Sequence, residues 1–133
     1  MKKIIWDDSL SVGEAELDSQ HRRLADLINL LGEEARESGN GKLVEKAIGK
    51  LTVYAFTHFG HEEKLLARCG FPGLEAQRAE HDQFSQTLMR FSRDAAVGLL
   101  DQAKLFNYLS QWWAHHILEE DMRYKPFVAK ENP

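Results

Sequence analysis

The sequence predicts an all-α protein, an up-down-up-down antiparallel four-helix bundle with an irregular N-terminal arm. Apolar residues recur at intervals of three or four over four long stretches, which is the spacing of one face of a helix. Strand-like alternation of apolar and polar residues is absent from the sequence. The connections between the four stretches are short and rich in glycine and proline, and helices joined by short loops pack as antiparallel neighbours.

The first half of the chain contains the arm and two helices. Residues 1–17 lack sustained helical spacing and form the arm. Asp18 is a residue type that caps helices well, so a helix over about 18–38 is expected to begin there. Gly39 and Gly41 end this helix, and a second helix covers about 42–68.

The second half contains two more helices. Pro72 disfavours helical backbone at the residue before it, which separates the second helix from the third. The third helix covers about 74–95, and the fourth, after Gly98, covers about 100–122. We expect the fourth helix to stop before Pro126, since proline interrupts the bonding of a helix interior.

Length, charge and cysteine content restrict the function classes. The 133 residues suit one domain, 1–133, with a core that needs no disulfide. The only cysteine, Cys69, excludes an internal disulfide framework and zinc sites that need several thiolates. A formal net charge of −4 argues against nonspecific nucleic-acid binding. No apolar run approaches the roughly 18–20 residues that span a bilayer, and no signal-peptide core is present. We therefore expect a cytoplasmic monomer that does not insert into membranes.

Each predicted helix turns at least one histidine toward the core. On the first helix, His21 lies seven residues before Ile28 on the inward stripe. On the second, His58 and Glu62 are four residues apart and share the inward face. The other inward polar residues, on the third and fourth helices, are Gln77, His81 and His116.

These inward polar residues indicate a metal site. A single inward histidine is more often a hydrogen-bonded core residue than a ligand, but here all four helices present an imidazole. A buried carboxylate such as Glu62 is costly unless it is partnered. Imidazole with carboxylate, and no thiolate, suits iron, manganese or zinc. The donors outnumber what one ion uses, which favours two ions that share bridging carboxylates in the bundle core.

Four motifs stand in a fixed order along the chain. They are Asp18-Ser19-Gln20-His21, then HxxxE at His58-Phe59-Gly60-His61-Glu62, then Ala79-Glu80-His81, then HxxxxD from His116 to Asp121. In this order, and together with Trp6 and Phe71-Pro72, they resemble the hemerythrin family in its bacterial single-domain form.

The resemblance implies an oxygen-binding protein rather than an enzyme, for storage, delivery or sensing of dioxygen. Its cofactor would be a non-haem di-iron centre with a solvent-derived oxo or hydroxo bridge. By position, the implied ligands are His21 and His58 on one iron, His81 and His116 on the other, and Glu62 and Asp121 as bridges.

Spacing raises questions about residues next to these ligands. Five residues turn about 140° on a regular helix, so spacing alone prefers Glu120 to Asp121 as the partner of His116, whereas the resemblance assigns Asp121. His61 and His115 each adjoin a proposed ligand but point about 60–100° away from it. We expect these two histidines to support the site or to lie at the surface.

Two positions depart from the family pattern. Gln77 stands four residues before His81, where the family has a histidine ligand, and it either binds metal weakly or yields the position to water. Trp113 stands where the family usually has an aliphatic residue over the oxygen pocket, which we expect Trp113 and Ile117 to line. The indole either crowds or gates dioxygen, or it only fills core volume.

Two other functions stay open from the sequence. An open position at Gln77 suits a di-iron redox enzyme that reduces dioxygen or peroxide. The same bundle also suits a metal store or a purely structural role.

Overall fold

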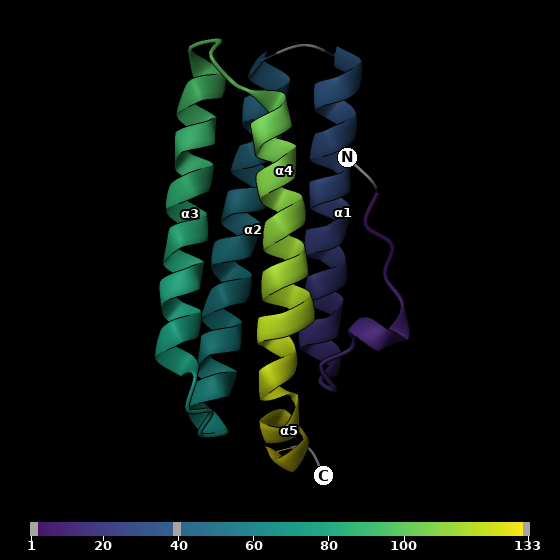
Figure 1. Ribbon diagram of the computed structural model, residues 1–133, viewed down its shortest axis with the longest axis vertical. Coiled ribbons are helices and arrows are strands. Elements are labelled where there is room, and N and C mark those ends of the chain that lie inside the picture. Colours follow the sequence, from purple (N-terminus) through teal and green to yellow (C-terminus); the bar gives the residue numbers. More distant parts are fainter. Residues whose placement is uncertain (1–2, 39–40, 132–133) are drawn as a thin grey trace.

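Four long helical segments form an antiparallel, up-down-up-down bundle, which confirms the predicted fold class (Figure 1). The computed structural model describes residues 3–38 and 41–131, and no strand occurs within these ranges; the predicted turn residues Gly39 and Asn40 lie outside them. The first three segments are α1 (Ala15–Ser38), α2 (Gly41–Arg68) and α3 (Leu74–Ala96). The fourth is a continuous run of α4 (Gln102–Trp112), the π-helix η2 (Trp113–Glu120) and α5 (Asp121–Glu131).

Helix α1 begins at Ala15, so the predicted start at Asp18 was wrong. The carboxylate of Glu14 accepts a hydrogen bond from the backbone N–H of Leu17 at 2.6 Å, and this bond satisfies one of the free donors at the helix start. The carboxylate that caps the helix is therefore Glu14 rather than Asp18.

Asp18 instead ties the N-terminal arm to α1. Its two oxygens accept from the backbone N–H of Val12 at 2.8 Å and from the hydroxyl of Ser11 at 2.5 Å. Farther along α1, Asn29 forms two 2.8 Å hydrogen bonds with the backbone of Ile4. The arm, which includes the short 3₁₀ helix η1 (Asp8–Leu10), is therefore held along the outside of the bundle (Figure 1).

Short connections after α2 and α3 set the antiparallel arrangement. Gly70, with φ of 70°, allows the N–H of Phe71 to donate to the carbonyl of Leu66 at 3.0 Å, which is a glycine-dependent helix stop. Gly98 ends α3 in the same way. Asp101 then caps α4 by accepting from a backbone N–H in its first turn at 3.1 Å.

The fourth segment continues through Pro126 to Glu131, so the predicted stop before this proline was wrong. An interior proline costs a helix about 3 kcal/mol. Tyr124 and Val128, four residues apart, are both fully buried against side chains of the arm, α1 and α2. Burial of a large apolar side chain contributes about 1.5–3 kcal/mol. Burial of these two side chains therefore offsets the cost of the proline.

The core consists of two apolar clusters with a polar layer between them. The larger cluster includes Leu24, Ala55, Phe84 and Leu109. The smaller contains Val12, Leu17, Leu65, Leu66, Tyr124 and Val128. On α1, α2 and the fourth segment the inward histidine stands between residues of the two clusters, as His21 does between Leu17 and Leu24. On α3, His81 stands between Phe84 of the larger cluster and Leu74, which packs against the smaller one. The polar layer therefore has a dry, apolar environment on both sides.

None of the helices in the described part of the chain combines the length and apolar character needed to cross a lipid bilayer.

Candidate metal centre

The residues predicted as metal ligands meet in the polar layer. Seven polar or charged side chains with at most 3% exposure form this layer within the described ranges: His21, His58, Glu62, Gln77, His81, His116 and Asp121. They come from all four long segments, so the chain must fold completely before they meet.

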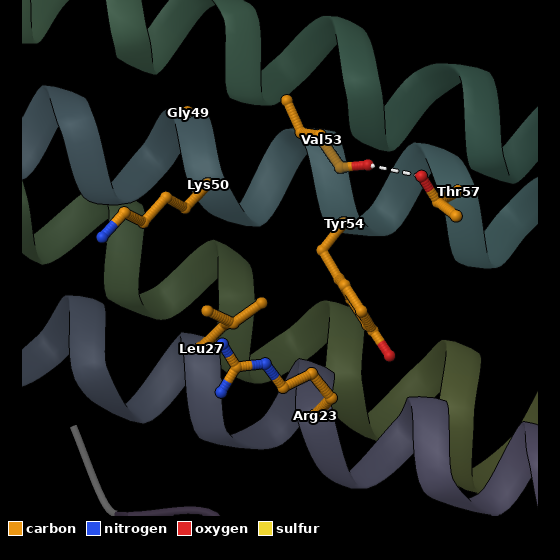
Figure 2. A pocket seen from close by; sticks show the side chains of 7 residues that line it. All are labelled: Arg23, Leu27, Gly49, Lys50, Val53, Tyr54 and Thr57. Atoms are coloured by element: carbon orange, nitrogen blue, oxygen red, sulfur yellow. Dashed lines mark hydrogen bonds between the residues drawn. The ribbon is translucent and has the colours of Figure 1, made fainter.

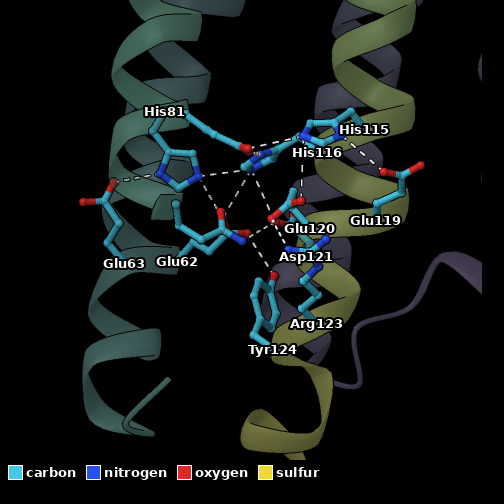
Figure 3. Close-up of polar contacts among 12 residues, drawn as sticks. Glu62, Glu63, His81, His115, His116, Glu119, Glu120, Asp121, Arg123 and Tyr124 are labelled. Atoms are coloured by element: carbon cyan, nitrogen blue, oxygen red, sulfur yellow. Dashed lines mark hydrogen bonds and ion pairs between the residues drawn. The ribbon is translucent and has the colours of Figure 1, made fainter. Parts of the chain in front are cut away.

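Glu62 lies close to all four imidazoles, and Figure 3 shows it beside two of them, His81 and His116. Its Oε1 is 3.0 Å from Nε2 of His81 and 3.9 Å from Nε2 of His116. Its Oε2 is 3.3 Å from Nε2 of His21 and 3.4 Å from Nε2 of His58. One carboxylate oxygen thus faces each pair of histidines, as a carboxylate that bridges two cations must.

Asp121 is the second carboxylate of the layer, and the π-helix brings it there. Its Oδ2 is 3.2 Å from Nε2 of His21, and its Oδ1 is 3.3 Å from Nε2 of His116. In η2 the N–H of Asp121 bonds to the carbonyl of His116, so residues five apart nearly align on one face. Glu120, which regular spacing preferred, lies outside and pairs with Arg123 at 3.3 Å.

Three of the imidazoles are held from outside by a neighbouring helix. The pairs are His58 Nδ1 with Gln20 Oε1 at 2.6 Å, His81 Nδ1 with Glu63 Oε2 at 2.8 Å, and His116 Nδ1 with Glu80 Oε2 at 2.7 Å. Each acceptor adjoins a predicted ligand in sequence but holds the ring on the next segment. Adjacency was the only sequence signal for these three residues, and it does not reveal which ring they hold.

The proton arrangement of the layer fits bound cations. Outward N–H donation from Nδ1 leaves the Nε2 lone pairs of neutral imidazoles facing inward. The Nε2 atoms of His81 and His116 are only 3.2 Å apart, and Nε2 of His58 and Oδ2 of Asp121 have no hydrogen-bond partner. Two groups have donor atoms that all lie within 4.8 Å of one another, and they share Glu62: His21, His58 and Glu62, and Glu62, His81 and His116. A cation in each group would satisfy these inward lone pairs.

The buried carboxylates also change the pKa values of the layer. Burial opposes protonation of His21, but the neighbouring carboxylates of Asp121 and Glu62 outweigh it and raise its pKa to about 9. Burial likewise opposes protonation of His116, but the negative charges of Asp121 and Glu62 raise its pKa to about 10. Burial prevails at His58 and lowers its pKa. The layer therefore attracts positive charge, which either protons or metal ions supply.

Tyr124 is a contact of this layer that the sequence analysis missed. Its hydroxyl donates to Oε2 of Glu62 at 2.9 Å, and its side chain is fully buried. Burial, together with the charges of Glu62 and Asp121, raises the pKa of this phenol well above its usual range. The predicted fourth helix ended at about residue 122, so Tyr124 lay outside it and the contact was concealed.

Gln77, one turn before His81 on α3, also reaches the layer. Its amide nitrogen donates to Oδ1 of Asp121 at 3.1 Å. Its carbonyl oxygen is buried without a hydrogen-bond partner. Gln77 therefore already contacts a predicted bridging carboxylate.

The structure also locates the predicted oxygen-pocket residues and the other two histidines. Trp113 and Ile117 lie in η2, with exposures of 6% and 0%. The neighbouring Trp112 stacks on His116, with ring centroids 5.0 Å apart. His61 and His115 are exposed and outside the polar layer.

A groove between α1 and α2 lies apart from this layer (Figure 2). It has a volume of about 480 Å³. Its described lining residues include no histidine, aspartate or glutamate: Arg23, Leu27, Gly49, Lys50, Val53, Tyr54 and Thr57. The groove therefore lacks the donors of a cation site.

Comparisons with known proteins agree with this geometry. Residues 12–128 match the family described as the hemerythrin HHE cation binding domain. The chain is 31% identical over 128 residues to a bacteriohemerythrin of Pseudomonas paraeruginosa, covering 93% of this chain and 80% of that protein. It is 34% identical over 122 residues to a hemerythrin-like protein of Naegleria gruberi, covering 90% of this chain and 89% of that protein. The crystal structure of a wild-type hemerythrin shares the fold, with a TM-score of 0.84 at 24% identity, over 94% of this chain and 97% of that chain.

Proposed function

The chain belongs to the hemerythrin family, and from this we propose that it binds dioxygen reversibly at a di-iron centre in the polar layer. Storage, delivery or sensing of dioxygen would follow from this activity. The observation that carries the proposal is Glu62, whose two oxygens face two separate pairs of imidazoles at 3.0–3.9 Å.

The proposed ligands follow from these two pairs. His21 and His58 would hold one iron, His81 and His116 the other, and Glu62 and Asp121 would bridge them together with a solvent-derived oxygen. Two iron ions held there would supply the electrons that binding of dioxygen requires.

The surrounding residues prepare the layer for this role. Gln20, Glu63 and Glu80 fix ring orientation and keep the inward nitrogens free to bind metal. The apolar clusters on either side exclude water, which favours reversible binding over loss of electrons to solvent. We propose that Trp113 and Ile117, both buried in η2, line the oxygen pocket.

Metal content and the visible spectrum test the proposal. The purified protein is expected to hold two iron ions per chain, measured by inductively coupled plasma mass spectrometry. In the reduced protein, air should produce a visible charge-transfer band that disappears when oxygen is removed. Fewer than two metal ions per chain, or a band that never reverses, would contradict reversible carriage.

A second candidate function, di-iron redox chemistry on dioxygen or peroxide, is favoured by Gln77. A glutamine carbonyl is a weaker donor than imidazole, and this one has no hydrogen-bond partner in the layer. One iron would then have a position open to exchange, which promotes irreversible oxidation.

Gln77→His is therefore expected to slow irreversible oxidation several-fold, because a third imidazole closes that position. The decay of the air-induced band measures this rate. Gln86→His, an exposed change on the same helix, is the matched control and should leave the decay unchanged. If the air-induced band decayed at the same rate in wild type and Gln77→His, Gln77 would no longer support the redox alternative.

A further inference from the structure

A second set of metal-binding side chains lies outside the polar layer, on the outer side of η2 (Figure 3). Donor atoms of Glu80, His115 and Glu120 all lie within 4.8 Å of one another. Nε2 of His115 is 3.3 Å from Oε1 of Glu80 and 3.7 Å from Oε1 of Glu120. One imidazole and two carboxylates thus converge from α3 and η2.

The π-helix sets this outer group by the same geometry as the inner one. His115 and Glu120 are five residues apart, as are His116 and Asp121. Because residues five apart nearly align in a π-helix, the wide turn forms two parallel histidine–carboxylate pairs. The inner pair faces the core, and the outer pair faces Glu80.

Both carboxylates of the outer group are oriented by other contacts. Oε2 of Glu80 accepts from Nδ1 of His116 at 2.7 Å, and Oε2 of Glu120 is 3.3 Å from Nη1 of Arg123. These contacts leave Oε1 of each residue directed at His115. The exposures of the two carboxylate side chains, 31% and 14%, allow access from solvent without free rotation.

The group has an excess of acceptors. Nδ1 of His115 is also 3.2 Å from Oε2 of Glu119, so both ring nitrogens face carboxylate oxygens. A neutral imidazole has one N–H, and its other nitrogen presents a lone pair to a carboxylate. A groove of about 250 Å³, lined in part by Glu80, His115 and Trp112, adjoins the group and leaves room for the water ligands of a cation.

We propose that Glu80, His115 and Glu120 bind a divalent transition-metal cation, at a site separate from the buried layer. Mixed imidazole and carboxylate donors with room for water suit Mn²⁺, Fe²⁺ or Zn²⁺. Its three donor residues are not among the proposed core ligands. Glu80 nevertheless connects the two sites, because one of its oxygens faces His115 and the other holds the His116 ring.

Titration of the purified protein, with its native core metal retained, by Mn²⁺ tests the site. Mn²⁺ binds most weakly of the first-row divalent ions and so leaves tighter core metals in place. Free Mn²⁺, followed by electron paramagnetic resonance, should reveal one additional ion per chain. His115→Ala and Glu120→Gln should each weaken this binding at least ten-fold, while core metal content and melting temperature stay at the wild-type values.

His61→Ala, which removes another exposed histidine, is the matched control and should bind Mn²⁺ as wild type does. Absence of additional Mn²⁺ in the wild type, or equal affinity in His115→Ala and wild type, would overturn the proposal. If His115→Ala also lost core metal, the outer site would not be separate from the buried layer. The difference in Mn²⁺ affinity between wild type and His115→Ala can be measured whether or not the core holds iron.

Discussion

Replacing Glu62 with glutamine is expected to lower bound iron from two ions per chain to less than one. Glu62 is the only side chain in the described ranges with oxygens near all four imidazoles, at 3.0–3.9 Å. The amide has nearly the same shape but no charge, so each imidazole pair keeps only Asp121 as an anionic partner. Removal of one partner from a buried charged group typically costs about 3–5 kcal/mol, which is enough to empty both positions.

Metal content per chain and the air-induced visible band measure this effect, and circular dichroism verifies that the helices remain. Glu75→Gln is the control, because this side chain is 82% exposed and pairs only with Arg78 in the described contacts. Asp121→Asn provides a second test of the carboxylate pair. Two iron ions per chain in Glu62→Gln would show that this carboxylate does not bridge the metals.

Truncation of Tyr124 to alanine is expected to destabilise the protein by about 3–5 kcal/mol, the range for removal of a large buried aromatic side chain. The ring is fully buried in the smaller apolar cluster, and its hydroxyl donates to Glu62. Tyr124→Phe keeps the ring and leaves Oε2 of Glu62 without this donor, which is expected to cost about 1–3 kcal/mol.

Urea unfolding at matched metal content measures both free energies. Phe56→Ala, at a side chain that is 75% exposed, should change stability by no more than about 0.5 kcal/mol. A Tyr124→Ala loss as small as that of the control would mean that the Tyr124 ring does not contribute to the core. Equal stability of Tyr124→Phe and wild type would show that the hydroxyl's hydrogen bond to Glu62 does not stabilise the protein.

Much of the fold could be predicted because it depends on local patterns. Stripes such as Phe84 and Leu88 on α3 require helices, and positive-φ glycines such as Gly70 end them where the chain turns. Of the two helix ends that were wrong, the start near Asp18 depended on which nearby carboxylate caps the helix, and the end near Pro126 depended on contacts distant in sequence. Asp18 bonds to the arm instead of capping, and burial of Tyr124 and Val128 continues the helix past a proline.

The sequence by itself determined which helices form and which polar residues turn inward, because helical periodicity assigns a face to His21, His58, Glu62, Gln77, His81 and His116. Only the tertiary structure decided how these faces meet.

The π-helix moves Asp121 inside and Glu120 outside, and regular helical spacing does not predict this shift. Gln20, Glu63 and Glu80 hold rings on neighbouring helices, an arrangement that exists only after packing. The physical reason is that helical periodicity shows which face of one helix a side chain lies on, whereas the metal layer depends on distances between side chains of different helices.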